Sequence, residues 1–342
     1  MNNGYEENNP QERLRISPSY LIGTWTGRLI LINTIVFLAL CVVSGSVFMP
    51  DTQSLLLFGA KEPVLIAQGE VWRLFTPIFI HIGIIHFAFN NFMLHVIGQQ
   101  LERVVGGAWF LAIYLSAGVV GNIASNLFTV NLSAGASGAI FGLLGLGFFL
   151  EYSIGNKIAH ATGEKPKNRV YAMTVAINLA FGFMMPFVDN SAHVGGLIAG
   201  VALAFAMVNL RPNKIFVPKR NLGIFVAMLL LVASLIGVFY AGSPQYLEKR
   251  LMQEAAESDD ISVAFQLLSQ TVLLNPHAKE ARFQRAKLLL FNREEQAAIA
   301  DLREIVEDES YRVRLEELVE KLTETGLVKQ AWQLQRILAH SN

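Results

Sequence analysis

Long apolar runs separated by short polar segments fill the first 240 residues of the chain. A helix crosses a bilayer with roughly 17 to 25 consecutive, mostly apolar residues, and on that measure the chain contains seven candidate spans. They lie near residues 28–48, 78–99, 108–128, 136–153, 170–188, 193–210 and 221–242. The fourth and sixth are short and rich in glycine. The pattern predicts an all-α protein built around a polytopic bundle of transmembrane helices.

Composition agrees with this prediction. Apolar residues make up 53% of the chain and charged residues only 16%, against roughly 25% charged residues in soluble domains. The first span follows a polar segment of more than twenty residues and is too long for the apolar region of a secretion signal. We therefore expect it to be retained as a helix. The single cysteine, Cys41, excludes a disulfide within one chain.

Basic residues predict the orientation of the bundle. Lysine and arginine cluster before the first span, between the fourth and fifth, and between the sixth and seventh. With seven spans these segments share one side, which the positive-inside rule makes cytoplasmic. The loops near 129–135 and 189–192, on the other side, contain no lysine or arginine. We expect a multi-pass protein of a bacterial plasma membrane with a cytoplasmic N-terminus, an outward-opening site and an extracytoplasmic tail.

Polar side chains inside apolar spans are costly and are functional candidates by default. In the second span, His86 and Asn90 are four residues apart and therefore share one helix face. Because this span is predicted to begin near residue 78, His86 should lie about 12 Å along the helix. Ser137 stands at the start of the fourth span and His193 at the start of the sixth. The predicted topology brings both in from the outer side.

These residues together supply the parts of a serine hydrolase. A serine hydroxyl needs a base to take its proton, and the transition state needs donors aimed at the developing oxyanion. Ser137 would be the nucleophile and His193 the general base and then acid. The backbone N–H of Ser137, with the side chains of His86 and Asn90, would bind the oxyanion. No acidic residue is expected at this level, so a dyad is favoured over a triad.

Glycines recur four residues apart in the two spans that carry the serine and the histidine. The pairs are Gly138 with Gly142 and Gly196 with Gly200. Small residues at this spacing allow transmembrane helices to approach closely. We expect close packing of these spans to bring Ser137 within hydrogen-bond distance of the histidine.

Five short motifs stand in order along the chain: W-R at Trp72-Arg73, H-x-x-x-N at His86–Asn90, E-R at Glu102-Arg103, G-x-S-G at Gly135–Gly138 and A-H-x-x-G-x-x-x-G at Ala192–Gly200. Together they resemble the rhomboid family of intramembrane serine proteases over roughly residues 20–210. The resemblance implies a six-helix catalytic core that hydrolyses peptide bonds in or beside transmembrane segments of other proteins, without a cofactor. One position differs, because the family often has a tyrosine stacked on the catalytic histidine where this chain has Phe141.

Other interpretations were weighed against the protease. His86 and His193 could be metal ligands, but the chain has no H-E-x-x-H motif, and we expect no metal. A transporter would be expected to show internal repeats, and none is recognisable. The chief alternative is a catalytically silent rhomboid-like protein that binds transmembrane helices of client proteins. The presence of both Ser137 and His193 favours the protease. His81 and His95 are interpreted as structural.

The composition changes from apolar to charged near residue 243, which predicts four parts: an N-terminal cytoplasmic segment at 1–27, the catalytic core at 28–210, a linker and seventh span at 211–242, and a helical domain at 243–342. In that domain, segments starting at Ala264 and Ala298 are 34 residues apart, with Leu268 and Leu302 in register. This is the tetratricopeptide period. Such a domain would bind an adaptor or a substrate, or would serve as a stabilising or dimerisation unit. No feature indicates nucleic-acid binding.

Overall fold

The computed structural model describes residues 22–162, 169–185, 188–207 and 243–340. Regular structure in these residues consists of helices, with one isolated β-bridge and no strand, which confirms the predicted all-α class for this part of the chain. The predicted seventh span at 221–242 lies outside the described residues. The chain divides into two compact units, residues 1–62 with 71–238, and residues 63–70 with 239–342.

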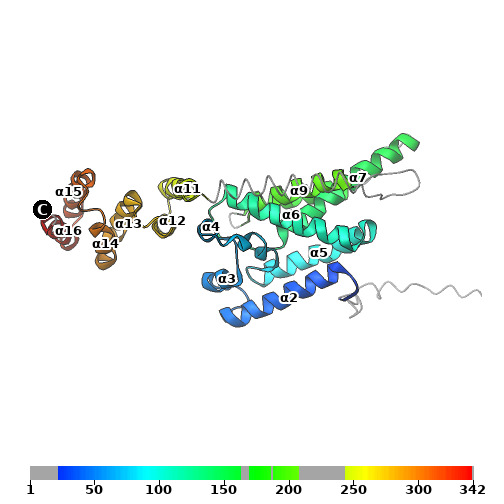
Figure 1. Cartoon of the computed structure of the whole chain (residues 1–342), viewed down its shortest axis with the longest axis horizontal. Helices are drawn as coiled ribbons and strands as arrows, with labels where there is room; N and C mark the ends of the chain where they lie inside the picture. The colour runs from blue at the N-terminus through cyan, green and yellow to red at the C-terminus, as the bar shows by residue number, and fades with distance from the viewer. Residues whose placement is uncertain (1–21, 163–168, 186–187, 208–242, 341–342) are drawn as a thin grey trace, which may run out of the picture. The chain divides into compact units, whose positions relative to one another are not determined.

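The first unit is a bundle of long helices that lie alongside one another (Figure 1). They are α2 (Trp25–Ser44), α5 (Ile84–Val105), α6 (Gly107–Phe128), α7 (Ser137–Thr162), α8 (Val170–Met184) and α9 (Asn190–Met207). Each overlaps one of the first six predicted spans. By length and hydropathy alone, α2 and α6 could each cross a membrane, and α7, α8 and α9 contain shorter apolar segments.

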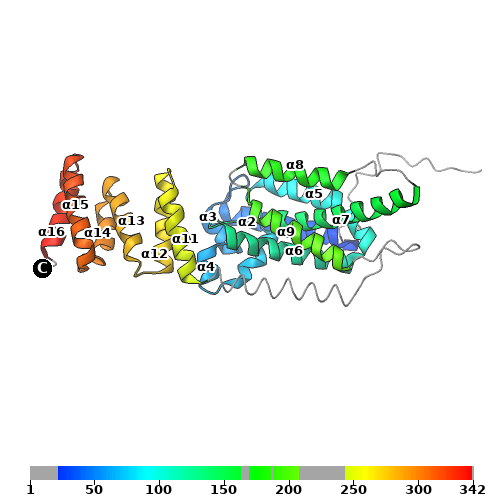
Figure 2. The same ribbon diagram turned by 90° about the horizontal axis from the view of Figure 1, so that it is seen from above.

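Three helices form the centre of this bundle. Helices α6, α7 and α9 pack on one another, α8 packs on α7 and α9, and α2 packs on α5 (Figure 2). The centre is apolar, with Phe110, Leu143 and Ala204 fully buried. The outward faces are apolar too, because Ile85 is 81% exposed and Phe205 63% exposed. A bundle that is apolar both inside and outside is what helices in a lipid bilayer require.

The second long helix starts later than the sequence predicts. A 3-10 helix, η3 (Thr76–Phe79), and a short extended segment precede α5, which begins at Ile84 rather than near residue 78. Pro77 stands in the first turn of η3, where its missing backbone N–H is tolerated. Gly83 has a φ of +90°, and a Cβ there would lie 2.1 Å from the carbonyl oxygen of Phe48. His86 is therefore in the first turn of α5, about 3 Å from its start at ~1.5 Å per residue, and the predicted depth of 12 Å is wrong.

Two charged residues of the family-like motifs form hydrogen bonds to groups at helix ends. The buried guanidinium of Arg73 donates to the carbonyl oxygens of Leu56 (2.8 Å) and Ala60 (3.1 Å) in the first loop, beside α3 (Thr52–Phe58). Glu102 accepts hydrogen bonds from the backbone N–H and the hydroxyl of Thr26 at 2.9 and 2.7 Å. Both contacts satisfy backbone or hydroxyl groups near the ends of helices.

The second unit consists of consecutive helices that pack on one another (Figure 2). They are α4 (Pro63–Ala67), α11 (Pro244–Glu257), α12 (Ile261–Leu274), α13 (Lys279–Phe291), α14 (Glu295–Arg303), α15 (Glu309–Glu324) and α16 (Val328–His340). Leu268 and Leu302 are both buried, as their common register requires. Buried Asp301 accepts hydrogen bonds from Arg282 at 2.9 Å and from Arg285 at 2.7 Å. The tetratricopeptide assignment of this tail stays a prediction.

Candidate active site

Ser137 and His193 meet between α7 and α9. Ser137 is the first residue of α7, and His193 lies in the first turn of α9. The Nε2 atom of His193 is 2.9 Å from the Oγ atom of Ser137. An unprotonated Nε2 at this distance accepts the hydroxyl proton, which is the first requirement for a serine nucleophile.

Packing sets the orientation of the histidine ring. Phe141, one turn after Ser137 on α7, stacks on His193 with ring centroids 4.3 Å apart and planes 15° from parallel. The Nδ1 atom of His193 has no hydrogen-bond partner among the described residues. Phe141 therefore stacks on the histidine at the position where the family often has a tyrosine, and the dyad stays a prediction.

Close approach of α7 and α9 makes this pairing sterically possible. A Cβ at Gly196 would lie 2.0 Å from the carbonyl oxygen of Gly138, and one at Gly200 would lie 2.0 Å from that of Gly142. Only glycine fits these two positions without moving a backbone. The close packing predicted from the glycine spacing is present.

The ring of His86 lies beside the segment that leads into α7. Gly135 has a φ of +147°, and a Cβ on it would lie 2.8 Å from Nε2 of His86 and 3.7 Å from Oγ of Ser137. The backbone N–H of Ile82 donates to Nδ1 of His86 at 3.3 Å, so in the neutral ring Nε2 carries the proton. The N–H of Ser137, at the first position of a helix, has no carbonyl partner within that helix. Both donors therefore border the space beside the serine hydroxyl.

The other polar residues of α5 are placed differently. Asn90 is buried, and its side-chain amide donates to the carbonyl oxygen of His86 at 2.9 Å. One of its two amide hydrogens is thus used within its own helix, and its oxyanion role stays a prediction. The buried His81 ring packs edge-on against His86, with centroids 5.4 Å apart. His95 lies 3.3 Å from the side chain of Gln99.

The expectation that no acidic residue lies at this level is wrong. Asp189 directly precedes α9, and its carboxylate accepts hydrogen bonds from the N–H of Ala192 at 3.0 Å and from the hydroxyl of Ser125 at 2.5 Å. The sequence contained the signal, because aspartate is a preferred residue just before a helix. Predicting the helix to begin at His193 rather than at Asn190 concealed it.

A buried lysine was also missed by the sequence analysis. The fully buried Lys61 donates from Nζ to the carbonyl oxygen of Asn131 at 2.7 Å and to the hydroxyl of Thr129 at 3.2 Å. Its backbone pairs with that of Ser133 through hydrogen bonds of 2.8 and 3.0 Å. These bonds fix the segment that leads to Gly135 against the first loop.

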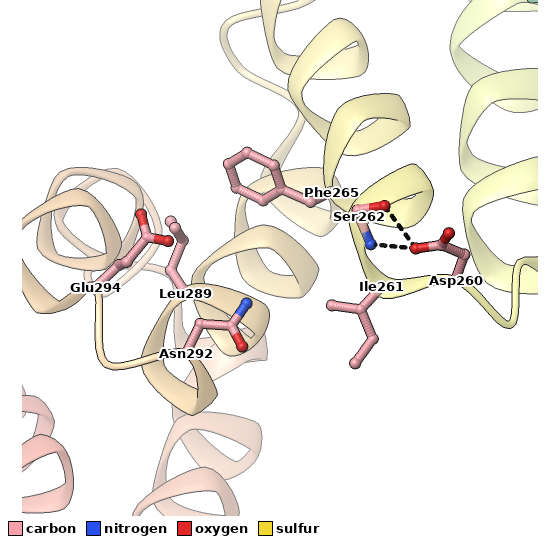
Figure 3. A pocket seen from close by; sticks show the side chains of 7 residues that line it. All are labelled: Asp260, Ile261, Ser262, Phe265, Leu289, Asn292 and Glu294. Carbon is pink, nitrogen blue, oxygen red and sulfur yellow. Dashed lines mark hydrogen bonds between the residues drawn. The ribbon is translucent and has the colours of Figure 1, made fainter.

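The helical tail contains a shallow cavity of about 470 Å³ between α12, α13 and the start of α14 (Figure 3). It is lined by Asp260, Ile261, Ser262, Phe265, Leu289, Asn292 and Glu294. The carboxylate of Asp260 accepts bonds from the N–H and hydroxyl of Ser262 and so caps α12. The lining contains no histidine, cysteine or lysine.

Comparison with known proteins supports the motif-based resemblance. The family model of the rhomboid domain matches residues 68–210. Rhomboid protease GluP of Bacillus subtilis is 42% identical over 236 residues, covering 68% of this chain and 44% of GluP. Rhomboid-like protease 2 of Toxoplasma gondii is 35% identical over 170 residues, covering 48% of this chain and 58% of that protein.

A further relative is covered over most of its length. The rhomboid protein YdcA of Bacillus subtilis is 35% identical over 156 residues, covering 44% of this chain and 73% of YdcA. In contrast, the chain spans about half the length of GluP and of the Toxoplasma protein. Rhomboid family proteins are integral membrane proteins, in agreement with the apolar outer faces of the bundle. This chain belongs to the rhomboid family.

Proposed function

We propose that this protein is an intramembrane serine endopeptidase that hydrolyses peptide bonds in or beside transmembrane segments of other proteins. The observation that carries the proposal is the 2.9 Å contact between His193 Nε2 and Ser137 Oγ. The stacked Phe141 ring and the glycine-lined approach of α7 and α9 support it. The names of the relatives GluP and Rhomboid-like protease 2 describe them as proteases.

In the proposed reaction, the Oγ atom of Ser137 attacks the scissile carbonyl carbon while His193 Nε2 takes the hydroxyl proton. The negative oxygen of the tetrahedral intermediate accepts hydrogen bonds from the Ser137 N–H and the Nε2–H of His86, with Asn90 as a further donor. His193 then protonates the leaving amine, and the acyl group stays on Ser137. A water molecule, deprotonated by His193, then attacks the acyl carbon; the ester bond to Oγ breaks, His193 returns the proton to Oγ, and the acid leaves. These steps require no cofactor.

The proposal also covers the substrates, the orientation in the membrane and the role of the helical tail. The substrates are transmembrane proteins, and the site opens to the outer side of a bacterial plasma membrane while the N-terminus stays in the cytoplasm. The basic loops predicted for one side of the bundle support this orientation. The helical tail has two proposed roles, binding of an adaptor or substrate and stabilisation or dimerisation.

Reaction with a fluorophosphonate probe in detergent solution tests the proposal. We expect the wild type to be labelled and Ser137→Ala and His193→Ala to remain unlabelled, because the probe reacts only with an activated serine. Ser153→Ala, which removes a hydroxyl farther along α7, is the matched control and should be labelled normally. A correctly folded wild type that does not react would overturn the protease and favour the catalytically silent alternative.

A further inference from the structure

Asp189 uses both oxygens of its carboxylate and its backbone carbonyl at the start of α9. One carboxylate oxygen accepts from the N–H of Ala192 at 3.0 Å, which caps the helix. The other accepts from the hydroxyl of Ser125 on α6 at 2.5 Å. The carbonyl oxygen of Asp189 accepts from the N–H of His193 at 3.2 Å. One residue thus joins the turn that carries the histidine to a neighbouring helix.

Helix α6, which carries Ser125, packs closely against α9. Ser125 is fully buried in α6. A Cβ at Gly195 would lie 2.5 Å from the Cβ of Ala124, and one at Gly121 would lie 2.7 Å from the carbonyl oxygen of Ala192. The two helices therefore touch through backbone and small side chains. A carboxylate bonded across such a contact fixes how far α9 is shifted and rotated along α6.

The chemistry of the residue also points to a connection between helices. A cap alone needs only one acceptor, and an uncharged serine or asparagine provides it without the cost of removing a charge from water. Asp189 is half-buried and uses its second oxygen on a different helix. The second bond is the feature that a capping role leaves unexplained.

His193 needs support beyond the Phe141 stack, because no described side chain forms a hydrogen bond on the Nδ1 side of its ring. Its Nδ1 atom has no hydrogen-bond partner among the described residues. We infer that Asp189, acting with Ser125, is a positioning residue that holds the first turn of α9 so that His193 stays within reach of Ser137. This inference rests on the proposed protease function. Asp189 touches neither the scissile bond nor the imidazole, and it acts through the helix backbone.

The experiment measures the concentration dependence of fluorophosphonate labelling, which separates the maximal rate of labelling from the probe's affinity. The variants are Asp189→Ala, Asp189→Asn and Ser125→Ala, each with its thermal unfolding measured in the same detergent. Asparagine can accept from Ala192 and donate to Ser125, so it restores both bonds. Asp51→Ala is the matched control, because Asp51 caps α3 through the N–H of Ser54 at 2.9 Å and its hydroxyl at 2.6 Å.

We expect Asp189→Ala to lower the maximal labelling rate on the order of 10²-fold, the effect of a displacement near 1 Å at a reacting group, with the probe's affinity unchanged. Ser125→Ala should show a smaller loss, and Asp189→Asn should recover the wild-type rate. Asp51→Ala should change the unfolding temperature alone. If Asp189 had a purely structural role, Asp189→Ala would likewise change only the unfolding temperature and leave the labelling rate unchanged.

Wild-type labelling rates in folded Asp189→Ala would therefore overturn the inference. If that variant does not fold, Ser125→Ala decides, and a wild-type rate there overturns the inference as well. Failure of the proposed function gives a different result, because the wild type itself would then remain unlabelled.

Discussion

A single methyl group added at Gly196 should separate the two helices that carry Ser137 and His193. A Cβ at this position would lie 2.0 Å from the carbonyl oxygen of Gly138, and since real Cβ atoms essentially never approach closer than 3.0 Å, the helices must part by about 1 Å. The atoms that would collide belong to backbone, so no side-chain rotation relieves the clash. The 2.9 Å separation of the serine and histidine atoms would then approach about 4 Å, beyond hydrogen-bond range.

This displacement should lower the rate of serine labelling more than it lowers the stability of the fold. A misplacement of about 1 Å can lower a rate on the order of 10²-fold, which corresponds to about 2.7 kcal/mol of transition-state stabilisation. We expect Gly196→Ala to bind a fluorophosphonate probe with unchanged affinity and to react with it more slowly by that factor. The assay is the rate of labelling at several probe concentrations, with thermal unfolding as the measure of folding.

The chain offers a matched control for the added methyl group. Gly23→Ala introduces the same group where nothing lies within 4 Å, and it should react at the wild-type rate. Gly200→Ala presses on Gly142 with the same 2.0 Å clash one turn farther along α9 and should show whether the effect declines with distance from the dyad. If folded Gly196→Ala reacts as fast as the wild type, the close approach of α7 and α9 does not set the dyad geometry and the reasoning fails.

Three further predictions concern other contacts. Phe141→Ala removes a ring stack worth about 0.5–1.5 kcal/mol and should slow labelling by up to about tenfold, whereas Phe141→Tyr should keep the wild-type rate. Equal labelling rates in the wild type and both variants would contradict the orienting role of Phe141. Lys61→Met leaves the carbonyl oxygen of Asn131 without its buried donor and should lower the free energy of unfolding by about 1–3 kcal/mol, and an unchanged denaturant midpoint would argue against that bond. In the tail, a hydrogen bond from Arg314 lowers the pKa of Glu280 from 4.5 to about 2. The pair therefore stabilises the fold above about pH 4.5 and loses this effect as the pH falls toward 2. Since both side chains are more than a third exposed, Arg314→Ala should lower the free energy of unfolding by at most ~1 kcal/mol at neutral pH. A difference in unfolding temperature between the wild type and Arg314→Ala that is the same at neutral pH as near pH 2 would refute the assignment.

Hydropathy and residue spacing predict the approximate positions of six long helices and the close approach of two of them. Apolar runs identify buried or lipid-facing helices because their composition does not depend on the details of neighbouring loops. The glycine pairs predicted the approach of α7 to α9 because backbones can come close only where side chains are absent. The meeting of Ser137 and His193 follows from that approach, since each stands at the start of its helix.

Helix ends were harder to predict, and both errors at the site come from them. The apolar composition of the segment before α5 predicts too early a start for this helix, because the 3-10 helix η3 ends at Phe79, Ile80 is extended and Gly83 has a positive φ. The start of α9 was placed too late, which hid Asp189. The bond from this carboxylate to Ser125 joins residues 64 positions apart. No local pattern reveals such a partner.

Helix ends would also help the proposed site, whose assigned residues include no lysine or arginine, to stabilise an anion. Ser137 is the first residue of α7, His86 is the third of α5, and His193 is the fourth of α9. Helix N-termini carry partial positive charge and backbone N–H groups that lack partners within the helix. The ends of α5 and α7 border the space where the negative oxygen of the proposed intermediate would form, whereas the end of α9 is capped by the carboxylate of Asp189. In the proposed mechanism the first two ends would supply the favourable potential that lysine or arginine would otherwise provide, and unlike those long side chains they are held in place by the packing of the bundle. The tight contacts at Gly121, Gly138 and Gly196 hold α6 and α7 against α9, so the proposed electrostatics at the end of α7 depend on the same close packing that brings Ser137 to His193.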